Sequence, residues 1–350
     1  MTMRRSRPFA LLVLVLLGSV TVDAAGLAQE GGQPSAALQP YALAPEIEER
    51  LLALDPECIS EQDVREVLAR TPAPRIIALH GSVPIMTMAP FAQFLVAMGY
   101  PVERLRNPPD GRLSSSSFTD SRELAGTIAW HYEREGLMPL LIGHSQGGML
   151  ALKVLQDLAG AAGERLPVWD PLRGTAENRS TIIDPHSGEE RQVVGLRVPY
   201  AAALATGSLM RVLLGQWDML ARLRSVPDSV EEFTGYFIAW DLIAGTGPNA
   251  ARDNPYQATG LARVRNVMLP PDYGHITLPL APHLADDPAT RRWVGSFDPR
   301  TQPAVPPVIP GADLRNIVHA ADIWFSVKKN WCLEAQRYAR ATRALRQARS

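Results

Sequence analysis

The sequence predicts an α/β fold with a mainly parallel central sheet, helices on both faces of that sheet, and inserted segments. Short apolar runs typical of buried strands alternate with stretches of helical periodicity. This alternation predicts a parallel sheet covered by helices. At 350 residues and 46% hydrophobic, the chain is long enough to bury a large core. Its formal net charge of −1 gives no overall attraction to nucleic acid.

The amino terminus has the layout of a secretory signal. Three arginines precede the apolar run of residues 9–17, and small residues follow, with Ala28 at a suitable cleavage point. We therefore expect a signal peptide over residues 1–28, a flexible leader over 29–45, and a secreted or periplasmic protein. An uncleaved anchoring start is the alternative, but a spanning helix needs about 20 apolar residues, so no stable membrane span is expected.

Residues 46–160 are expected to alternate between helices and strands. Ser60 and Asp63 have the spacing of a capping box, which predicts a helix that ends near Ala69. Further along, compact apolar runs predict strands, and helical spacing that stops at a glycine predicts helices. The predicted strands cover residues 75–80, 101–105 and 138–142, and the predicted helices cover residues 91–98, 120–135 and 147–158.

Residues 164–197 interrupt this alternation. Pro185, Ser187 and Gly188 are typical of a hairpin turn, so we expect an inserted β-rich segment. The main domain is expected to span residues 46–298. The later pattern predicts a strand over 198–205, a mostly helical stretch over 208–233, strands over 236–240 and 264–269, a proline-rich connector over 299–312 and an amphipathic helix over 313–350.

Residues 143–147 read Gly-His-Ser-Gln-Gly and join a predicted strand to a predicted helix. In a G-x-S-x-G sequence at such a turn, the strained backbone exposes the serine, and the glycines leave room for neighbouring elements. In this motif and its setting, the chain resembles the α/β-hydrolase superfamily over about residues 75–285. The resemblance implies an α/β-hydrolase fold, with Ser145 as the nucleophile and the backbone amide of Gln146 as an oxyanion donor.

A serine hydroxyl becomes a strong nucleophile only when a base removes its proton, so this chemistry requires a histidine. In the resembled superfamily the acid follows the serine, and the histidine comes last. His275 lies in a loop just after the last predicted strand and is the expected base. His283 and His319, further along the chain, are the alternatives.

The carboxylate that orients this histidine is expected at the carboxyl end of a strand, where catalytic groups gather in open α/β sheets. Asp241 comes directly after the predicted strand 236–240 and is the expected acid of the triad. Asp218, Asp228 and Asp253 are the other carboxylates considered, and solvated structural roles suit them.

The resemblance also implies a second oxyanion donor in the loop after the first central strand. Residues 80–82 read His-Gly-Ser and match the family's His-Gly turn, well before Ser145 in the chain. The backbone amide of Ser82 or Val83 is therefore the expected donor. A donor of this type contributes roughly 3 kcal/mol in the transition state.

Two inserted segments occupy the positions where hydrolases of this type have lids. They are residues 164–197 and 208–233, for which ordinary core or surface packing is the alternative. Met86 and Met88 follow the oxyanion turn, and Trp217 lies in the second segment. We expect these three side chains to line an apolar acyl pocket and bind substrate, although such residues usually belong to the core.

The chain has two cysteines, Cys58 and Cys332, which are too few for a disulfide scaffold or a four-thiolate zinc site. Export would bring them into an oxidising compartment, where thiols pair. A disulfide between them would join the first ordered helix to the last one. Two buried free thiols are the alternative.

These observations predict an exported serine hydrolase that cleaves small-molecule or lipid carboxylic esters through an acyl-enzyme. An amidase or peptidase with the same triad would use the same tetrahedral intermediate and is an alternative. A non-catalytic exported binding protein on a hydrolase scaffold is another. The sequence has no metal-ligand cluster, phosphate-binding glycine loop or dinucleotide fingerprint, so no cofactor is expected.

Overall fold

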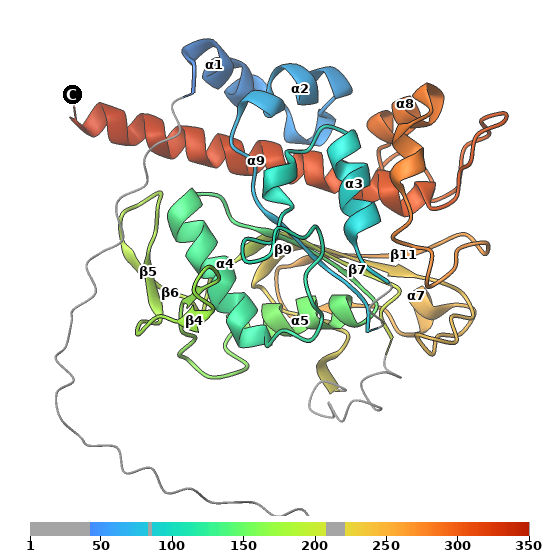
Figure 1. Cartoon of the computed structure of the whole chain (residues 1–350), viewed down its shortest axis with the longest axis horizontal. Coiled ribbons are helices and arrows are strands. Elements are labelled where there is room, and N and C mark those ends of the chain that lie inside the picture. The colour runs from blue at the N-terminus through green and yellow to red at the C-terminus, as the bar shows by residue number, and fades with distance from the viewer. Residues whose placement is uncertain (1–42, 83–85, 208–220, 350) are drawn as a thin grey trace, which may run out of the picture. The chain divides into compact units, whose positions relative to one another are not determined.

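The structure is a computed structural model that describes residues 43–82, 86–207 and 221–349 (Figure 1). The described part contains a five-stranded sheet in the order β1-β2-β7-β9-β11, and each neighbouring pair of strands is parallel. The prediction of an α/β chain with a mainly parallel sheet is thereby confirmed. The strands are β1 (Ile76–Leu79), β2 (Leu140–His144), β7 (Val198–Leu204), β9 (Val230–Phe237) and β11 (Arg263–Met268).

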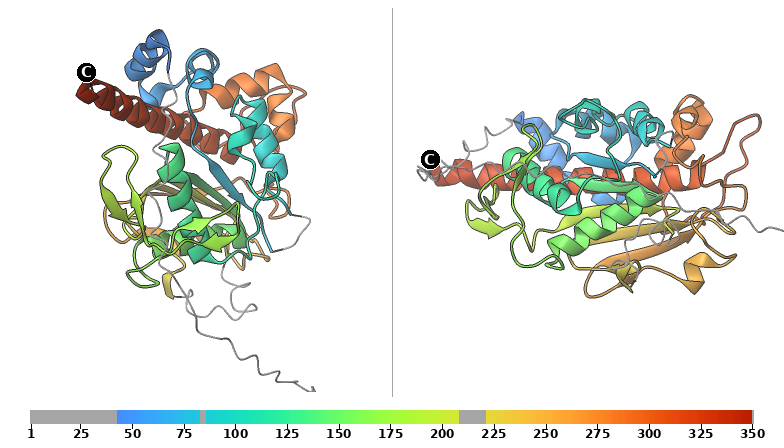
Figure 2. Two further views of the ribbon diagram at one scale, coloured as in Figure 1. Left: turned by 60° about the vertical axis from the view of Figure 1, so that its left-hand side comes forward. Right: turned by 60° about the horizontal axis from the view of Figure 1, so that its bottom comes forward.

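Helices cover both faces of this sheet, as Figures 1 and 2 show. They are α1 (Pro45–Ala53), α2 (Glu61–Glu66), α3 (Ala89–Ala97), α4 (Ser121–Glu135), α5 (Gln146–Leu158), α7 (Ala250–Asp253), α8 (Pro288–Ser296) and α9 (Ile317–Arg349). Leu140 and Ile142 of β2 belong to a core cluster with α3, α8 and α9, whereas Leu141 belongs to a second cluster with α4 and α5. The alternation of side chains along a strand explains this division.

The carboxyl-terminal helix α9 forms part of the first core cluster. Trp324 and Trp331 on this helix are fully buried against the rest of that cluster. Glu334 of α9 accepts a hydrogen bond of 2.8 Å from the backbone N–H of Met138, just before β2. The predicted amphipathic helix over 313–350 is therefore present, and it packs across one face of the sheet.

The strand β9 corrects two expectations from the sequence. The stretch 208–233 was expected to be mostly helical, but β8 (Ser225–Val226) and the first half of β9 lie within it. Residues 208–220, the rest of that stretch, lie outside the described residues. The strand expected over 236–240 ends at Phe237, so Asp241 lies in the following loop and not directly after the strand.

Two adjacent glutamates explain why β9 does not read as a buried strand. Glu231 and Glu232 interrupt its apolar pattern, and both are held by cations from α9. Arg337 donates a hydrogen bond of 2.9 Å to Glu231, and Lys329 Nζ lies 2.5 Å from Glu232. Because these partners are more than 90 residues away, local periodicity could not reveal them.

The strand predicted over residues 101–105 is wrong. This segment forms a short 3₁₀ turn, η3 (Val102–Arg104), beside the edge of the sheet. Arg104 donates a hydrogen bond of 2.6 Å to Glu135 of α4. Arg75, just before β1, donates a long hydrogen bond of 3.4 Å to the carbonyl of Glu103. These polar contacts hold the segment as a turn and not as a strand of the sheet.

The β-rich insertion predicted at residues 164–197 is confirmed. It contains the antiparallel pairs β3 (Trp169–Asp170) with β4 (Thr175–Ala176), and β5 (Thr181–Ile183) with β6 (Glu190–Gln192). In the turn of the β5–β6 hairpin, the His186 ring is 2.8 Å from the carbonyl oxygen of Gly136. Gly136 precedes β2 whereas Ser145 follows β2, so this hairpin lies at the opposite end of the strand from Ser145. A lid role for this hairpin is therefore wrong.

The two cysteines do not form the expected disulfide. Cys58 is an exposed free thiol in the 3₁₀ turn η1 (Pro56–Cys58), and Cys332 is a buried free thiol on α9. Burial raises the pKa of the Cys332 thiol to about 12, so this sulfur is a neutral part of the core. The sequence indicates that both cysteines lie in or near helices. It does not determine the distance between their side chains, because that distance depends on how the helices pack.

The expected signal peptide over residues 1–28 and most of the leader over 29–45 lie outside the described residues. The first described helix, α1, begins at Pro45. Within the described ranges, no helix combines the length and the apolar character needed to cross a membrane.

Candidate active site

Ser145 lies at the sharp turn between β2 and α5. Its backbone φ is 53°, a left-handed value that is costly for a residue with a side chain. The turn is held by a hydrogen bond of 2.8 Å from the Ser145 N–H to the carbonyl of Leu204 at the end of β7. A strained serine held in this way at the carboxyl end of a central strand is typical of a nucleophile.

The glycines around Ser145 are required by close contacts between backbones. A Cβ atom at Gly143 would lie 2.3 Å from the carbonyl oxygen of Gly147. A Cβ atom at Gly147 would lie 2.2 Å from the carbonyl oxygen of Leu79 in β1. Since no side-chain rotation relieves a clash with a backbone oxygen, these positions exclude every residue except glycine.

We expect Gly147→Ala to lower the free energy of unfolding by about 3 kcal/mol, because β1 and α5 would have to separate. This loss exceeds the gain of up to about 1 kcal/mol that alanine brings to a helix. Urea unfolding checks the prediction. Gly247→Ala is the matched control, since no atom of the part of the chain that the structure describes lies within 4 Å of its Cβ position, and we expect a change within about 0.5 kcal/mol. Equal stability of the two variants would contradict the packing described.

The structure brings Ser145, His275 and Asp241 together, although they are far apart in the sequence. His275 Nε2 lies 3.0 Å from Ser145 Oγ, and His275 Nδ1 lies 2.7 Å from Asp241 Oδ2. Because an ionised carboxylate only accepts, Nδ1–H donates to Asp241, which leaves Nε2 to accept from the serine hydroxyl. The side chains of His275 and Asp241 are almost fully buried, at 4% and 2% exposed.

The loop after β9 holds the Asp241 carboxylate in this orientation. Asp241 Oδ1 accepts hydrogen bonds from the backbone N–H groups of Ile243 (3.1 Å) and Ala244 (3.0 Å). Trp240, just before it, has a positive φ of 56°, so the backbone turns sharply at this point. The two oxygens of Asp241 therefore have separate partners, and only Oδ2 faces the imidazole.

The alternative histidines lie elsewhere. His283 Nε2 is 3.8 Å from Asp313 at the protein surface. His319 is fully buried on α9, and its Nε2–H donates a hydrogen bond of 3.0 Å to the carbonyl of Leu278. Burial lowers the pKa of His319 to about 3, so it is a neutral core residue.

The alternative carboxylates also have other partners. Asp228 accepts hydrogen bonds from the backbone N–H groups of Leu261 and Ala262, the latter at 3.0 Å. Asp253 forms an exposed ion pair of 3.2 Å with its neighbour Arg252. Asp218 lies outside the described residues. Of the described carboxylates considered from the sequence, Asp241 is the one hydrogen-bonded to His275.

The turn expected to supply oxyanion donors lies against Ser145. A Cβ atom at Gly81 would lie 3.3 Å from Ser145 Cβ, so Ser82, the next residue, is close to the serine. Gln146 is the first residue of α5, and the first N–H groups of a helix have no acceptor within it. Ser117 joins the two sides, because its hydroxyl donates to the Gly81 carbonyl (3.3 Å) and its carbonyl accepts from Gln146 Nε2 (3.4 Å).

The residues expected to bind substrate have different surroundings. Met86 is buried, and its methyl carbon lies 3.4 Å from the Cβ position of Gly81, beside the oxyanion turn. Met88 is fully buried in the first core cluster and presents no surface to a ligand, so its expected substrate contact is wrong. Trp217 and Val83 lie outside the described residues.

Three residues around the turn at residues 143–147, which we call the elbow, were not identified from the sequence. They are His144, which contacts His275, Ser117, which bridges the oxyanion turn and α5, and Thr206, whose hydroxyl donates to the Ser145 carbonyl (3.2 Å). The run of four serines at 114–117 is unusual in composition, but nothing in it indicates this contact. The other two become visible only when the loops are placed together in space.

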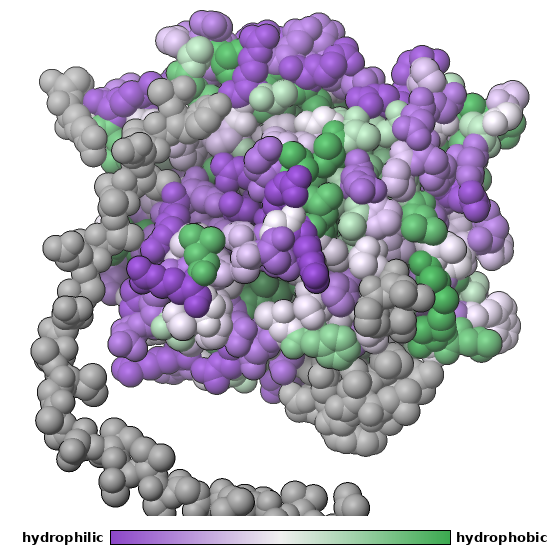
Figure 3. Space-filling model, viewed as in Figure 1, coloured by the Kyte–Doolittle hydropathy of each residue, from purple (hydrophilic) through white to green (hydrophobic). Residues whose placement is uncertain are grey.

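Large hydrophobic side chains are exposed on the loops that hold Asp241 and His275. Trp240 is 68% exposed and Leu242 is 82% exposed, and Ile276 beside the histidine is 54% exposed. Figure 3 shows hydrophobic surface where α7 lies in Figure 1, next to the loop between β9 and α7. Isolated exposed hydrophobic residues are ordinary, and these three are distinguished by lying next to Asp241 or His275 in the sequence.

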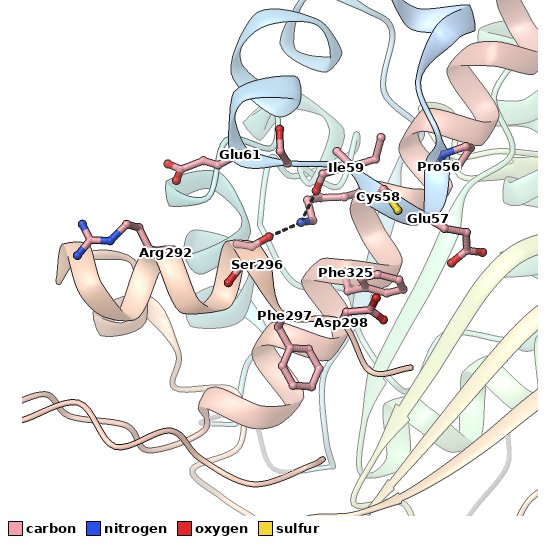
Figure 4. A pocket seen from close by; sticks show the side chains of 13 residues that line it. Pro56, Glu57, Cys58, Ile59, Glu61, Arg292, Ser296, Phe297, Asp298 and Phe325 are labelled. Atoms are coloured by element: carbon pink, nitrogen blue, oxygen red, sulfur yellow. Dashed lines mark hydrogen bonds between the residues drawn. The ribbon is translucent and has the colours of Figure 1, made fainter. Parts of the chain in front are cut away.

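A cavity of about 550 Å³ is lined by residues 56–61 and 292–298 together with α9. Figure 4 shows Cys58, Ile59, Ser296 and Phe325 around it. None of the residues that line it belongs to the triad. Lys328, at its wall, donates hydrogen bonds to the carbonyls of Ile59 (2.8 Å) and Gly295 (2.6 Å), and so joins η1 to the end of α8.

The buried Lys328 predicts a change of stability with pH. Burial lowers its pKa from the ordinary 10.5 to about 8, so between these values the unfolded chain binds more protons and stability rises with pH. Relative to Lys328→Met, the wild-type free energy of unfolding should rise by about 1 kcal/mol between pH 7 and 9. Urea unfolding of both proteins at both pH values measures this difference, in which shared titrations cancel. A difference that does not change with pH would contradict the prediction.

No protein-family model and no curated protein sequence matches this chain. In the described ranges, no group of three or more His, Cys, Asp and Glu side chains is placed to bind a metal ion. What the site can do therefore follows from its own residues and their geometry.

Proposed function

We propose that this chain is an exported serine hydrolase with an α/β-hydrolase fold that cleaves carboxylic esters through an acyl-enzyme. The observation behind the proposal is the hydrogen-bonded series Ser145–His275–Asp241, with distances of 3.0 and 2.7 Å, built on a serine with a left-handed backbone. Nucleophile, base and orienting acid have the mutual geometry that acyl transfer requires. The basic and apolar start of the sequence supports export.

In the proposed reaction, Ser145 Oγ attacks the ester carbonyl carbon while its proton moves to His275 Nε2. The carbonyl oxygen becomes an oxyanion that accepts hydrogen bonds from the backbone amides of Gln146 and Ser82. When the intermediate collapses, the bond to the leaving alcohol breaks, and the alcohol takes the proton from His275. Water then attacks the acyl-serine by the same steps and releases the carboxylic acid. Asp241 keeps the imidazole in the required tautomer and stabilises the imidazolium.

We expect the preferred esters to have an apolar acyl or alcohol part. The reason is that Trp240, Leu242 and Ile276 are exposed on the loops that hold Asp241 and His275. An apolar substrate would remove these side chains from water, which favours binding by roughly 25 cal/mol for each Å² buried. We expect Met86, buried beside the oxyanion turn, to contact the acyl group.

A fluorophosphonate probe tests the proposal. We expect the purified protein to react with one equivalent of probe, and peptide mass mapping to locate the adduct on Ser145. Turnover of p-nitrophenyl esters of several acyl lengths, compared with matched anilides, then tests the bond cleaved. Faster turnover of the anilides would indicate an amidase with the same triad. Absence of labelling would contradict the enzyme and favour a binding protein.

A further inference from the structure

His144, the residue before the nucleophile, lies between the two halves of the candidate site. We propose that His144 is a positioning residue that fixes the main chain of His275 against the oxyanion turn at Gly81. This inference rests on the proposed hydrolase function. The His144 ring is fully buried, and its centroid lies 5.1 Å from that of the His275 ring.

One edge of the His144 ring holds the loop of the base. His144 Nε2 lies 2.8 Å from the carbonyl oxygen of His275. A carbonyl oxygen only accepts, so Nε2 carries the proton in this contact, and in a neutral ring Nδ1 is then unprotonated. The contact is made to the backbone of His275, and its imidazole remains free for Ser145 and Asp241.

The other edge of the ring meets the oxyanion turn. His144 Nδ1 is buried and has no hydrogen-bond partner among the described residues. A Cβ atom at Gly81 would lie 3.4 Å from this nitrogen, so the ring packs directly against Gly81. One rigid ring therefore sets the spacing between the backbone of the base and the turn that supplies an oxyanion donor.

The charge of His144 suits this position. Burial, and after it the proximity of His275, lowers the pKa of His144 to about 3, so the ring is neutral. A cation at this point would oppose the positive charge that forms on His275 during the reaction. A neutral donor fixes the loop without making the base weaker.

A fixed backbone matters here because His275 lies in a loop. Its imidazole must lie within hydrogen-bond distance of both Ser145 and Asp241, and a displacement of about 1 Å can lower a rate by about 10². The segment between β11 and the 3₁₀ turn η5 (Pro282–Ala285) contains neither helix nor strand. The contact with His144 ties this loop to the elbow itself.

Three variants separate positioning from simple packing. We expect His144→Leu, which lacks a donor, to lower kcat for a p-nitrophenyl ester by up to about 10² with little change in KM. His144→Gln should restore most of this loss, since its Nε2 lies as many bonds from Cβ as that of histidine. His144→Asn is one bond shorter and should not. The contrast between Gln and Asn decides the question even when His144→Leu does not fold.

His319→Leu is the matched control, because His319 is equally buried and also donates to a carbonyl of this loop, at Leu278. We expect it to lose stability but to keep kcat within about threefold of the wild type. Equal losses of kcat in His144→Leu and His319→Leu, or equal activity of the Gln and Asn variants, would overturn the inference.

A spectroscopic measurement keeps the inference separate from the proposed function. The His275 Nδ1–H bonded to Asp241 should give a downfield proton resonance in the wild type. We expect this resonance to broaden through faster exchange in His144→Leu and His144→Asn, and to persist in His144→Gln and His319→Leu. An unlabelled, inactive wild type would end the proposed function, and this pattern of resonances would still decide whether His144 positions the imidazole.

Discussion

Replacing Ser145 with alanine is expected to lower kcat for a p-nitrophenyl ester by about 10⁶, with little change in KM. The reason is that His275 and Asp241 have no attacking atom to activate once the hydroxyl is absent. Activity of about 10³–10⁴ over water should remain, because the oxyanion donors are backbone amides that the substitution leaves in place. Steady-state kinetics on the same ester measures both values.

The control for Ser145→Ala is Ser187→Ala, in the turn of the distant β5–β6 hairpin. Its hydroxyl accepts a hydrogen bond of 3.2 Å from the N–H of Glu189 and has no contact with the triad. We expect this variant to react with fluorophosphonate like the wild type, whereas Ser145→Ala should not react. Hydrolysis by Ser145→Ala at the wild-type rate would show that another residue is the nucleophile.

Asp241→Asn is expected to lower kcat by about 10⁴. The backbone N–H groups of Ile243 and Ala244 point at the Oδ1 position, so the asparagine carbonyl must occupy that position. The amide NH₂ group then faces His275 Nδ1, which forces the imidazole into the tautomer with its proton on Nε2. In that tautomer Nε2 donates to Ser145 instead of accepting its proton, so the base is lost.

Asp253→Asn is the control for this second variant, since Asp253 is an exposed carboxylate at the end of α7 that pairs with the exposed Arg252. We expect its kcat within about twofold of the wild type. A large loss of kcat in Asp253→Asn, with full activity in Asp241→Asn, would show that Asp241 does not orient the histidine. The thermal midpoints of both variants show whether a loss of kcat comes from unfolding.

The parts of the fold that were predicted correctly depend on local patterns. Four of the five central strands coincide with short apolar runs, and the helices that end at Gly99, Gly136 and Gly160 follow their periodicity closely. The elbow was predictable because its glycines and serine are contiguous in the sequence. The pairing of Ser145 with His275 and Asp241 could be anticipated from chain order in the resembled superfamily.

The errors occurred where distant contacts override local pattern. The two glutamates of β9 fit a buried strand because α9, near the other end of the chain, supplies their cations. The segment 101–105 has the composition of a strand but is held as a turn by arginine contacts. His144 reads as one more apolar-strand residue, since its partner carbonyl lies 131 residues further along.

Helix α9 also determines when the chain can become native. Its two buried tryptophans complete a wall of the core, and they follow all five strands of the central sheet in the chain. Until α9 emerges from the ribosome, one face of the sheet lacks part of its cover, so we expect the nascent sheet to remain loosely structured until that helix is made. Under the proposed export, this delay would favour passage of the unfolded chain through a translocation pore.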